Sequence, residues 1–213
     1  MAVDRSDIQG NVLRAYGSGY PCTAYVFVAV ADVAGGRSWL EETTDLVSSD
    51  EEWRGERPRS HRNVALTCTG LRALGVPEAV IGTFSDEFRQ GMAARSQMLG
   101  DLGVNSPERW DTGLGTGAAH VLVTLNARSR DEIDAELASL RDEIEHAPGV
   151  SIVHEQYAEL LTAPAGDPAA PPREQFGFAD GAAQPAIAGV SDGGAAGGGV
   201  PLADGTWRAL ALG

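Results

Sequence analysis

The sequence predicts an α+β fold: a four-stranded antiparallel sheet with helices packed on one face. Four apolar, β-branched runs lie before residue 160, and helical segments separate the first from the second and the third from the fourth. Two strand-helix-strand units in succession are the order of a ferredoxin-like sandwich. The chain has 213 residues and is 43% hydrophobic, so it can bury the core that such a sandwich needs.

The first unit begins with residues 23–31, TAYVFVAVA, whose β-branched and aromatic side chains predict a buried strand. Residues 37–47 follow two glycines and carry a tryptophan, leucines and a valine at roughly helical spacing. They predict a helix of about three turns. Residues 48–60 predict an acidic surface loop. Residues 63–68, NVALTC, predict the second strand.

Residues 69–101 predict a series of short helices between the two units. Gly75 closes the first helix, Pro77 begins the next, and Ser85 caps a longer one. We expect the apolar face of the longer helix to pack into the core. Its residues are Phe88, Met92 and Leu99.

A glycine-rich stretch, residues 113–118, matches the spacing of a dinucleotide-binding fingerprint. That fingerprint requires a preceding strand and a following helix, because the helix N-terminus faces the pyrophosphate. Here residues 120–125, HVLVTL, follow the glycines and predict a strand instead. We therefore reject a nucleotide site at this position.

The second unit contains the clearest helix of the chain. Ser129 and Glu132 form a capping box, and apolar residues continue at spacings of four, three and four. Residues 150–157 predict the last strand. We therefore assign residues 1–162 to a ferredoxin-like domain. Residues 163–213 form a separate Pro- and Gly-rich segment of different composition.

Composition excludes several classes of function. Sixteen basic and thirty acidic residues give a net charge of −14, which disfavours binding to nucleic acid or to an anionic membrane. We find neither a signal peptide nor a transmembrane segment, and we expect a cytoplasmic protein. Cys22 and Cys68 are expected to be buried, reduced thiols at strand edges, and the sequence predicts no metal site.

Residues 175–185, QFGFADGAAQP, place the carboxylate of Asp180 among small and apolar residues. Taken alone, Asp180 and Gly181 are typical of a turn. Three stretches in order nevertheless resemble the dye-decolourising (DyP-type) haem peroxidases: DIQGNVLR at residues 7–14, NVALTCTGLRALG at residues 63–75, and GFADG at residues 177–181, which has the form GxxDG.

The resemblance implies an enzyme with haem b that uses hydrogen peroxide to oxidise organic reductants such as dyes or phenols. Asp180 matches the distal acid/base of that family, and peroxide heterolysis needs such a group to move a proton between the two oxygens. Gly177, Phe178 and Gly181 would line the distal pocket as cofactor-binding residues, because small residues let the backbone approach a flat ring closely.

The resemblance also implies that the iron ligand and a distal arginine come from a second domain, which would begin near residue 213. We expect this chain to supply the N-terminal half, and we expect His61, His120, His146 and His154 to be structural or surface residues. The alternative is a haem-free ferredoxin-like interaction domain. Such a domain would dimerise through its sheet or pair with a separate, complementing C-terminal half.

Overall fold

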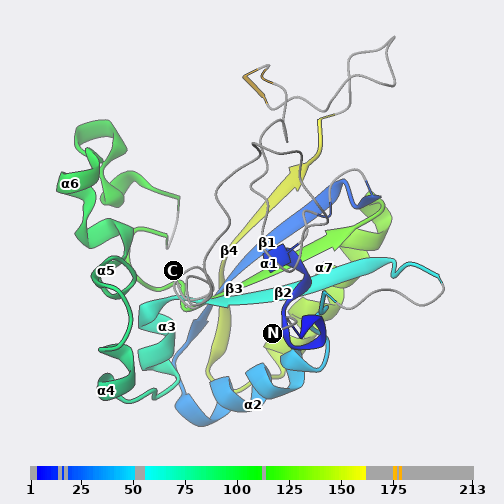
Figure 1. The fold of residues 1–213 in the computed structure, drawn as a ribbon, viewed down its shortest axis with the longest axis horizontal. Coiled ribbons are helices and arrows are strands. Elements are labelled where there is room, and N and C mark those ends of the chain that lie inside the picture. The colour runs from blue at the N-terminus through cyan, green and yellow to red at the C-terminus, as the bar shows by residue number, and fades with distance from the viewer. Residues whose placement is uncertain are drawn as a thin grey trace.

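A computed structural model describes residues 4–13, 16, 19–50, 56–111, 114–161, 175, 176 and 178. Figure 1 shows the sheet crossing the molecule, with helices at its rear and at its lower edge. The elements in chain order are η1 (Arg5–Asp7), α1 (Gly10–Leu13), β1 (Cys22–Val30), α2 (Val33–Thr44), β2 (Ser60–Leu66), α3 (Cys68–Ala73), α4 (Glu78–Ile81), α5 (Asp86–Ala94), α6 (Ser96–Leu99), η3 (Gly103–Asn105), η4 (Pro107–Arg109), β3 (Val121–Ala127), α7 (Arg130–Glu145) and β4 (Val150–Glu159).

The four strands form one sheet in the order β2-β3-β1-β4, and each neighbouring pair is antiparallel. β1 and β3 are the central strands. The register of β1 against β4 shifts between Phe27 and Val28, so β4 carries a bulge at that point. This arrangement confirms the predicted fold class. The chain before β3 also leads into a strand rather than a helix, as the rejection of a nucleotide site requires.

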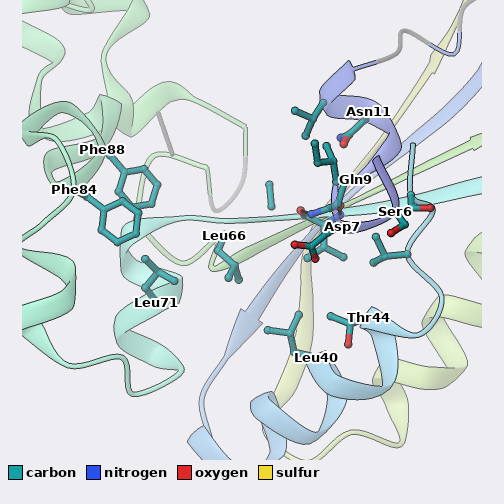
Figure 2. Close-up of a pocket in the computed structure, with 16 residues that line it drawn as sticks. Ser6, Asp7, Gln9, Asn11, Leu40, Thr44, Leu66, Leu71, Phe84 and Phe88 are labelled. Carbon is teal, nitrogen blue, oxygen red and sulfur yellow. Dashed lines mark hydrogen bonds between the residues drawn. The ribbon is translucent and has the colours of Figure 1, made fainter. Parts of the chain in front are cut away.

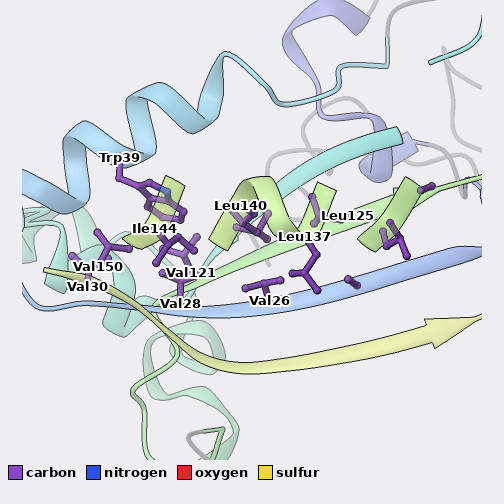
Figure 3. Close-up of a cluster of buried hydrophobic side chains, with 14 of the residues drawn as sticks. Val26, Val28, Val30, Trp39, Val121, Leu125, Leu137, Leu140, Ile144 and Val150 are labelled. Atoms are coloured by element: carbon purple, nitrogen blue, oxygen red, sulfur yellow. The ribbon is translucent and has the colours of Figure 1, made fainter. Parts of the chain in front are cut away.

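The core lies between the sheet and helices α2 and α7. Residues alternate along β1 between buried and half-buried positions, because successive side chains point to opposite faces. Figure 3 shows the buried side chains of α7 pointing toward those of β1. The α7 residues in this core are the four apolar residues that the sequence pattern selects: Ile133, Leu137, Leu140 and Ile144. The Ser129 side chain caps the helix by accepting a hydrogen bond from the Glu132 amide.

Helix α2 begins four residues earlier than the sequence predicts. The Asp32 carboxylate caps it by accepting a hydrogen bond from the Gly35 amide at 2.6 Å. The two glycines that precede the predicted helix lie inside the observed one, where neighbouring atoms leave no room for side chains. A Cβ atom on Gly35 would lie 1.9 Å from the carbonyl oxygen of Pro148. Close approach between elements, rather than turn formation, therefore explains this glycine.

Strand β2 begins and ends earlier than predicted, and Cys68 lies in a helix. The Thr67 side chain accepts a hydrogen bond from the Gly70 amide and caps α3, which ends the strand at Leu66. At the other end of β2, the buried Arg62 guanidinium contacts Glu143 of α7 through two nitrogens, at 2.6 and 3.0 Å. This bidentate ion pair fastens the edge of the sheet to the helix that covers it.

The expectation that the apolar face of the longest inserted helix packs into the core is wrong. Met92 is 62% exposed and Leu99 45% exposed, while Phe88 is half-buried. The helix is interrupted at Gly91, which has φ of 69°, so the three residues do not share one helical face. Figure 1 shows α4, α5 and α6 lying beyond α3, to one side of the sheet.

Both cysteines are free and buried, as the sequence predicts. Burial raises the pKa of the Cys22 thiol, because the thiolate loses hydration in apolar surroundings. None of the helices in the described ranges has the length and apolar character that a membrane crossing requires.

We expect Leu137→Ala to lower the free energy of unfolding by about 2–5 kcal/mol, because it opens a cavity under the centre of the sheet. Urea unfolding followed by circular dichroism measures the change. Met98→Ala is the matched control, since Met98 is 69% exposed and its truncation should change stability by about 0.5 kcal/mol or less. Equal losses in the two variants would contradict this core.

Candidate functional site

The opening segment, residues 4–13, is bound to the outer edge of β2 through the side chain of Gln9. The Gln9 amide nitrogen donates to the Val64 carbonyl at 2.8 Å, and its amide oxygen accepts from the Val64 backbone N–H at 2.8 Å. A primary amide has a donor nitrogen and an acceptor oxygen, as a peptide unit does. Gln9 therefore takes the place that a neighbouring strand would occupy on this edge.

Backbone pairing extends this contact on both sides of Gln9. The Gly10 amide donates to the Ser48 carbonyl, and the Asp50 amide donates to the Ile8 carbonyl, each at 2.8 Å. The Asp50 carboxylate is fully buried and accepts a hydrogen bond from the Arg5 guanidinium at 2.6 Å. Together these bonds hold the opening segment and the chain after α2 against β2.

A cleft of about 670 Å³ lies between this opening segment and the inserted helices. Figure 2 shows Phe84, Phe88 and Leu71 on one side of the cleft and polar residues of the opening segment on the other. The two phenylalanine rings lie 4.9 Å apart between centroids, tilted by 34°. The remaining lining residues are Ser6, Asp7, Ile8, Gln9, Asn11, Val12, Leu40, Thr44, Val47, Ser49, Val64, Ala65 and Leu66.

Two histidines are held in structural contacts. The His61 ring is 2% exposed and stacks on Tyr16, with centroids 4.2 Å apart, while Tyr20 meets it edge-on at 4.4 Å. His120 accepts a hydrogen bond at Nδ1 from the Val30 backbone N–H at 2.9 Å. These rings pack the sheet and satisfy its backbone, as expected for structural histidines.

The other two histidines lie nearer the surface. His154 is half-buried, with its ring centroid 5.8 Å from that of Phe27. His146 is exposed at the end of α7, and its Nδ1 lies 2.8 Å from the Asp142 carbonyl oxygen, a contact that raises the pKa of His146. Within the described ranges, no three His, Cys, Asp or Glu side chains gather as a metal-binding group would require.

The face of the sheet opposite α7 is half-exposed. Residues at alternate positions of the two central strands project from it, and they are largely apolar or hydroxyl-bearing. Tyr25 and Phe27 of β1 and Leu122 and Thr124 of β3 all have intermediate exposure. A surface of this composition on a sheet is suited to packing against another protein layer.

The site predicted around Asp180 lies almost entirely outside the described residues. Gly177, Asp180 and Gly181 are outside them, so their roles remain predictions. Phe178 is described and is 73% exposed. The Pro- and Gly-rich segment 163–213 is described only at residues 175, 176 and 178, which leaves the proposed domain boundary a prediction as well.

The fold defines a ferredoxin-like α+β domain, and comparison with known proteins identifies its family. The family model described as "DyP dimeric alpha+beta barrel domain" matches residues 7–159. The chain therefore belongs to the DyP family, as its three motifs indicated.

Curated relatives carry peroxidase names. The dye-decolorizing peroxidase of Mycena epipterygia is 28% identical over 199 residues, covering 90% of this chain and 34% of that protein. Peroxidase 2 of Mycetinis scorodonius is 28% identical over 194 residues, covering 90% and 35%. The chain thus spans about a third of the length of these curated relatives.

Solved structures give the same answer for the fold. A fungal DyP-type peroxidase from Auricularia auricula-judae matches with a TM-score of 0.72 and 24% identity, over 91% of this chain and 40% of that chain. A dye-decolorizing peroxidase whose heme pocket was engineered for asymmetric sulfoxidation matches with a TM-score of 0.71 and 25% identity, over 90% and 40%.

Sequence reasoning missed both the role of Gln9 and the cleft. The resemblance selected the stretch DIQGNVLR but assigned no contact to Gln9, because a side chain that completes a sheet edge leaves no periodic pattern. The cleft escaped notice because Phe88 was predicted to pack into the core and Phe84 was assigned no role. Gly91, inside the predicted helix, is the sequence signal that could have indicated an interruption of its apolar face.

We expect Gln9→Met to lower the free energy of unfolding by about 1–3 kcal/mol, since methionine has similar length but cannot pair with the Val64 peptide groups. The uncovered edge should also promote self-association, which light scattering after size-exclusion chromatography would detect. Gln156→Met, at an exposed position of β4, is the control. Identical behaviour of the two variants would refute a specific role for the Gln9 amide.

Proposed function

We propose that the chain is the N-terminal part of a dye-decolourising haem peroxidase, which reduces hydrogen peroxide and oxidises an organic reductant such as a dye or a phenol. The observation that carries the proposal is the family match over residues 7–159. The peroxidase names of the curated relatives support it. The heme pocket of one solved relative supports haem as the cofactor.

The cleft beside the opening segment does not fit haem. Axial ligands of haem iron in proteins are histidine, cysteine, methionine or tyrosine side chains. None of these four residue types lines the cleft. We therefore assign the haem to a complementing C-terminal half that supplies the iron ligand and an arginine, with residues 177–181 of this chain reaching the distal side.

Within that assembly, Asp180 is the distal acid/base. Its carboxylate would accept a proton from one peroxide oxygen and return it to the departing oxygen, which leaves as water. Gly177 and Gly181 would allow the backbone to approach the ring plane, and Phe178 would keep the pocket apolar.

In the haem-loaded protein that includes the second half, we expect Asp180→Asn to lower kcat/KM for peroxide-dependent dye oxidation by about 10²- to 10⁴-fold. The Soret band should remain, because Asp180 is not a ligand of the iron. Asp192→Asn, in another Asp-Gly pair of the same segment, is the matched control and should retain activity. Equal activity in the two variants, or no Soret band after haem supply, would refute the assignment.

A second candidate is a haem-free interaction domain that dimerises through its sheet or pairs with a separately made half. The half-exposed apolar face of β1 and β3 favours it, as does the family description as a dimeric barrel. Burial of such a face against a second sheet would remove apolar surface from water on both sides. This candidate requires a colourless assembly rather than a haem protein.

Phe27→Asp should dissociate such an assembly, because a carboxylate would be buried without a partner at the centre of the interface. Sedimentation analysis of the 213-residue chain measures the mass, and circular dichroism confirms that the variant is folded. Val104→Asp, at a position that is 78% exposed on the inserted segment, is the control. A monomeric chain that binds haem at full occupancy would exclude this candidate.

A further inference from the structure

The cleft between the opening segment and the inserted helices has the size of a small-molecule site. Its volume of about 670 Å³ lies within the roughly 300–1,000 Å³ typical of ligand pockets. Its residues come from six parts of the chain: the opening segment, α2, the chain after α2, β2, α3 and the segment containing Phe84 and Phe88. The bonds of Gln9 to Val64 fix one wall against the sheet edge.

The opposite wall is apolar and partly aromatic. Phe84 and Phe88 are half-buried, and their rings form a tilted pair at the rim. Leu66 and Leu71 continue this surface toward the centre of the cleft, as Figure 2 shows. Offset or edge contacts with a third ring are the arrangement that such a pair favours, so the wall suits a planar aromatic group.

The charge of the cleft is negative. Asp7 is the one charged residue among those that line it, it is exposed, and it makes no ion pair with another described residue. The adjoining hollow beneath Leu71 contains Arg37 and Glu41, whose charges offset each other. With a net charge of −14 on the whole chain, both the local and the overall field favour a cation.

We propose that this cleft binds a planar aromatic molecule with a cationic amine, its ring against Phe84 and Phe88 and its charge near Asp7. The proposal goes beyond the peroxidase function and does not depend on haem, because the cleft lacks the residues that would ligate iron. Polar side chains of the opening segment, among them Asn11 and Ser6, line the same side of the cleft as Asp7. Their oxygen atoms can accept hydrogen bonds from an ammonium group.

Three naphthalene probes of equal ring size test the proposal on the 213-residue chain: 2-naphthylmethylamine, 2-naphthalenemethanol and 2-naphthalenesulfonate. Binding is measured by isothermal titration calorimetry, and amide chemical shifts locate the bound probe. We expect the cation to bind most tightly, the alcohol less tightly and the anion least, with shifts at Gln9, Asn11 and Leu66. The preference for the cation should decrease with added salt.

Two pairs of variants separate the contribution of charge from that of the aromatic wall. Asp7→Asn should weaken binding of the amine about fivefold at low salt and leave the alcohol unchanged, whereas Asp131→Asn, the same charge change on α7, should do neither. Phe88→Ala should weaken the amine and the alcohol alike, by about threefold to tenfold, whereas Met92→Ala on the same helix should not.

Three outcomes would overturn the proposal. One is equal weakening of amine binding by Asp7→Asn and Asp131→Asn, which would show that the preference for the cation depends only on the net charge of the chain. Another is binding of the amine that Phe88→Ala leaves unchanged in a variant shown to be folded by circular dichroism. The third is the absence of shifts at the cleft with all three probes, which is also the result expected if a second copy of the chain covers it.

Discussion

The described structure depends on the burial of one sheet face beneath α7 and α2. The buried residues of β1 and β3 meet four apolar residues of α7, each 5% exposed or less. Isolated helices of about this length are marginal in water. α7 therefore depends on the apolar surface that this contact buries. The Arg62 and Glu143 ion pair, the cap at Ser129 and the bound opening segment are fastened to this layer.

The parts of the fold that the sequence predicts are those with a regular period. Four apolar residues of α7 recur at the helical period, and all four are buried: Ile133, Leu137, Leu140 and Ile144. Alternation along β1 likewise matches its burial. Boundaries are less predictable, since the start of α2 depends on how closely Gly35 approaches Pro148, a contact between segments more than a hundred residues apart.

The two candidate sites also differ in how far the sequence could predict them. Asp180 could be singled out because its neighbours in the sequence are small and apolar, and a family resemblance gave it a role to test. The cleft could not be anticipated, because it depends on how the inserted segment with Phe84 and Phe88 lies relative to the opening segment, which is far from it in the sequence. The Gln9 side chain bonds to Val64, 55 residues away in the sequence, and no local sequence pattern predicts such a partner.

The order of the strands has a consequence for synthesis on the ribosome. β1 is the second strand from one edge, yet both of its neighbours, β3 and β4, follow it by many residues, from Val121 and Val150 onward. The nine residues of β1 are mostly apolar or β-branched. Such a segment readily pairs with other chains before its own neighbouring strands have been synthesised. During synthesis β1 therefore lacks both of its sheet neighbours until β3 and β4 have emerged.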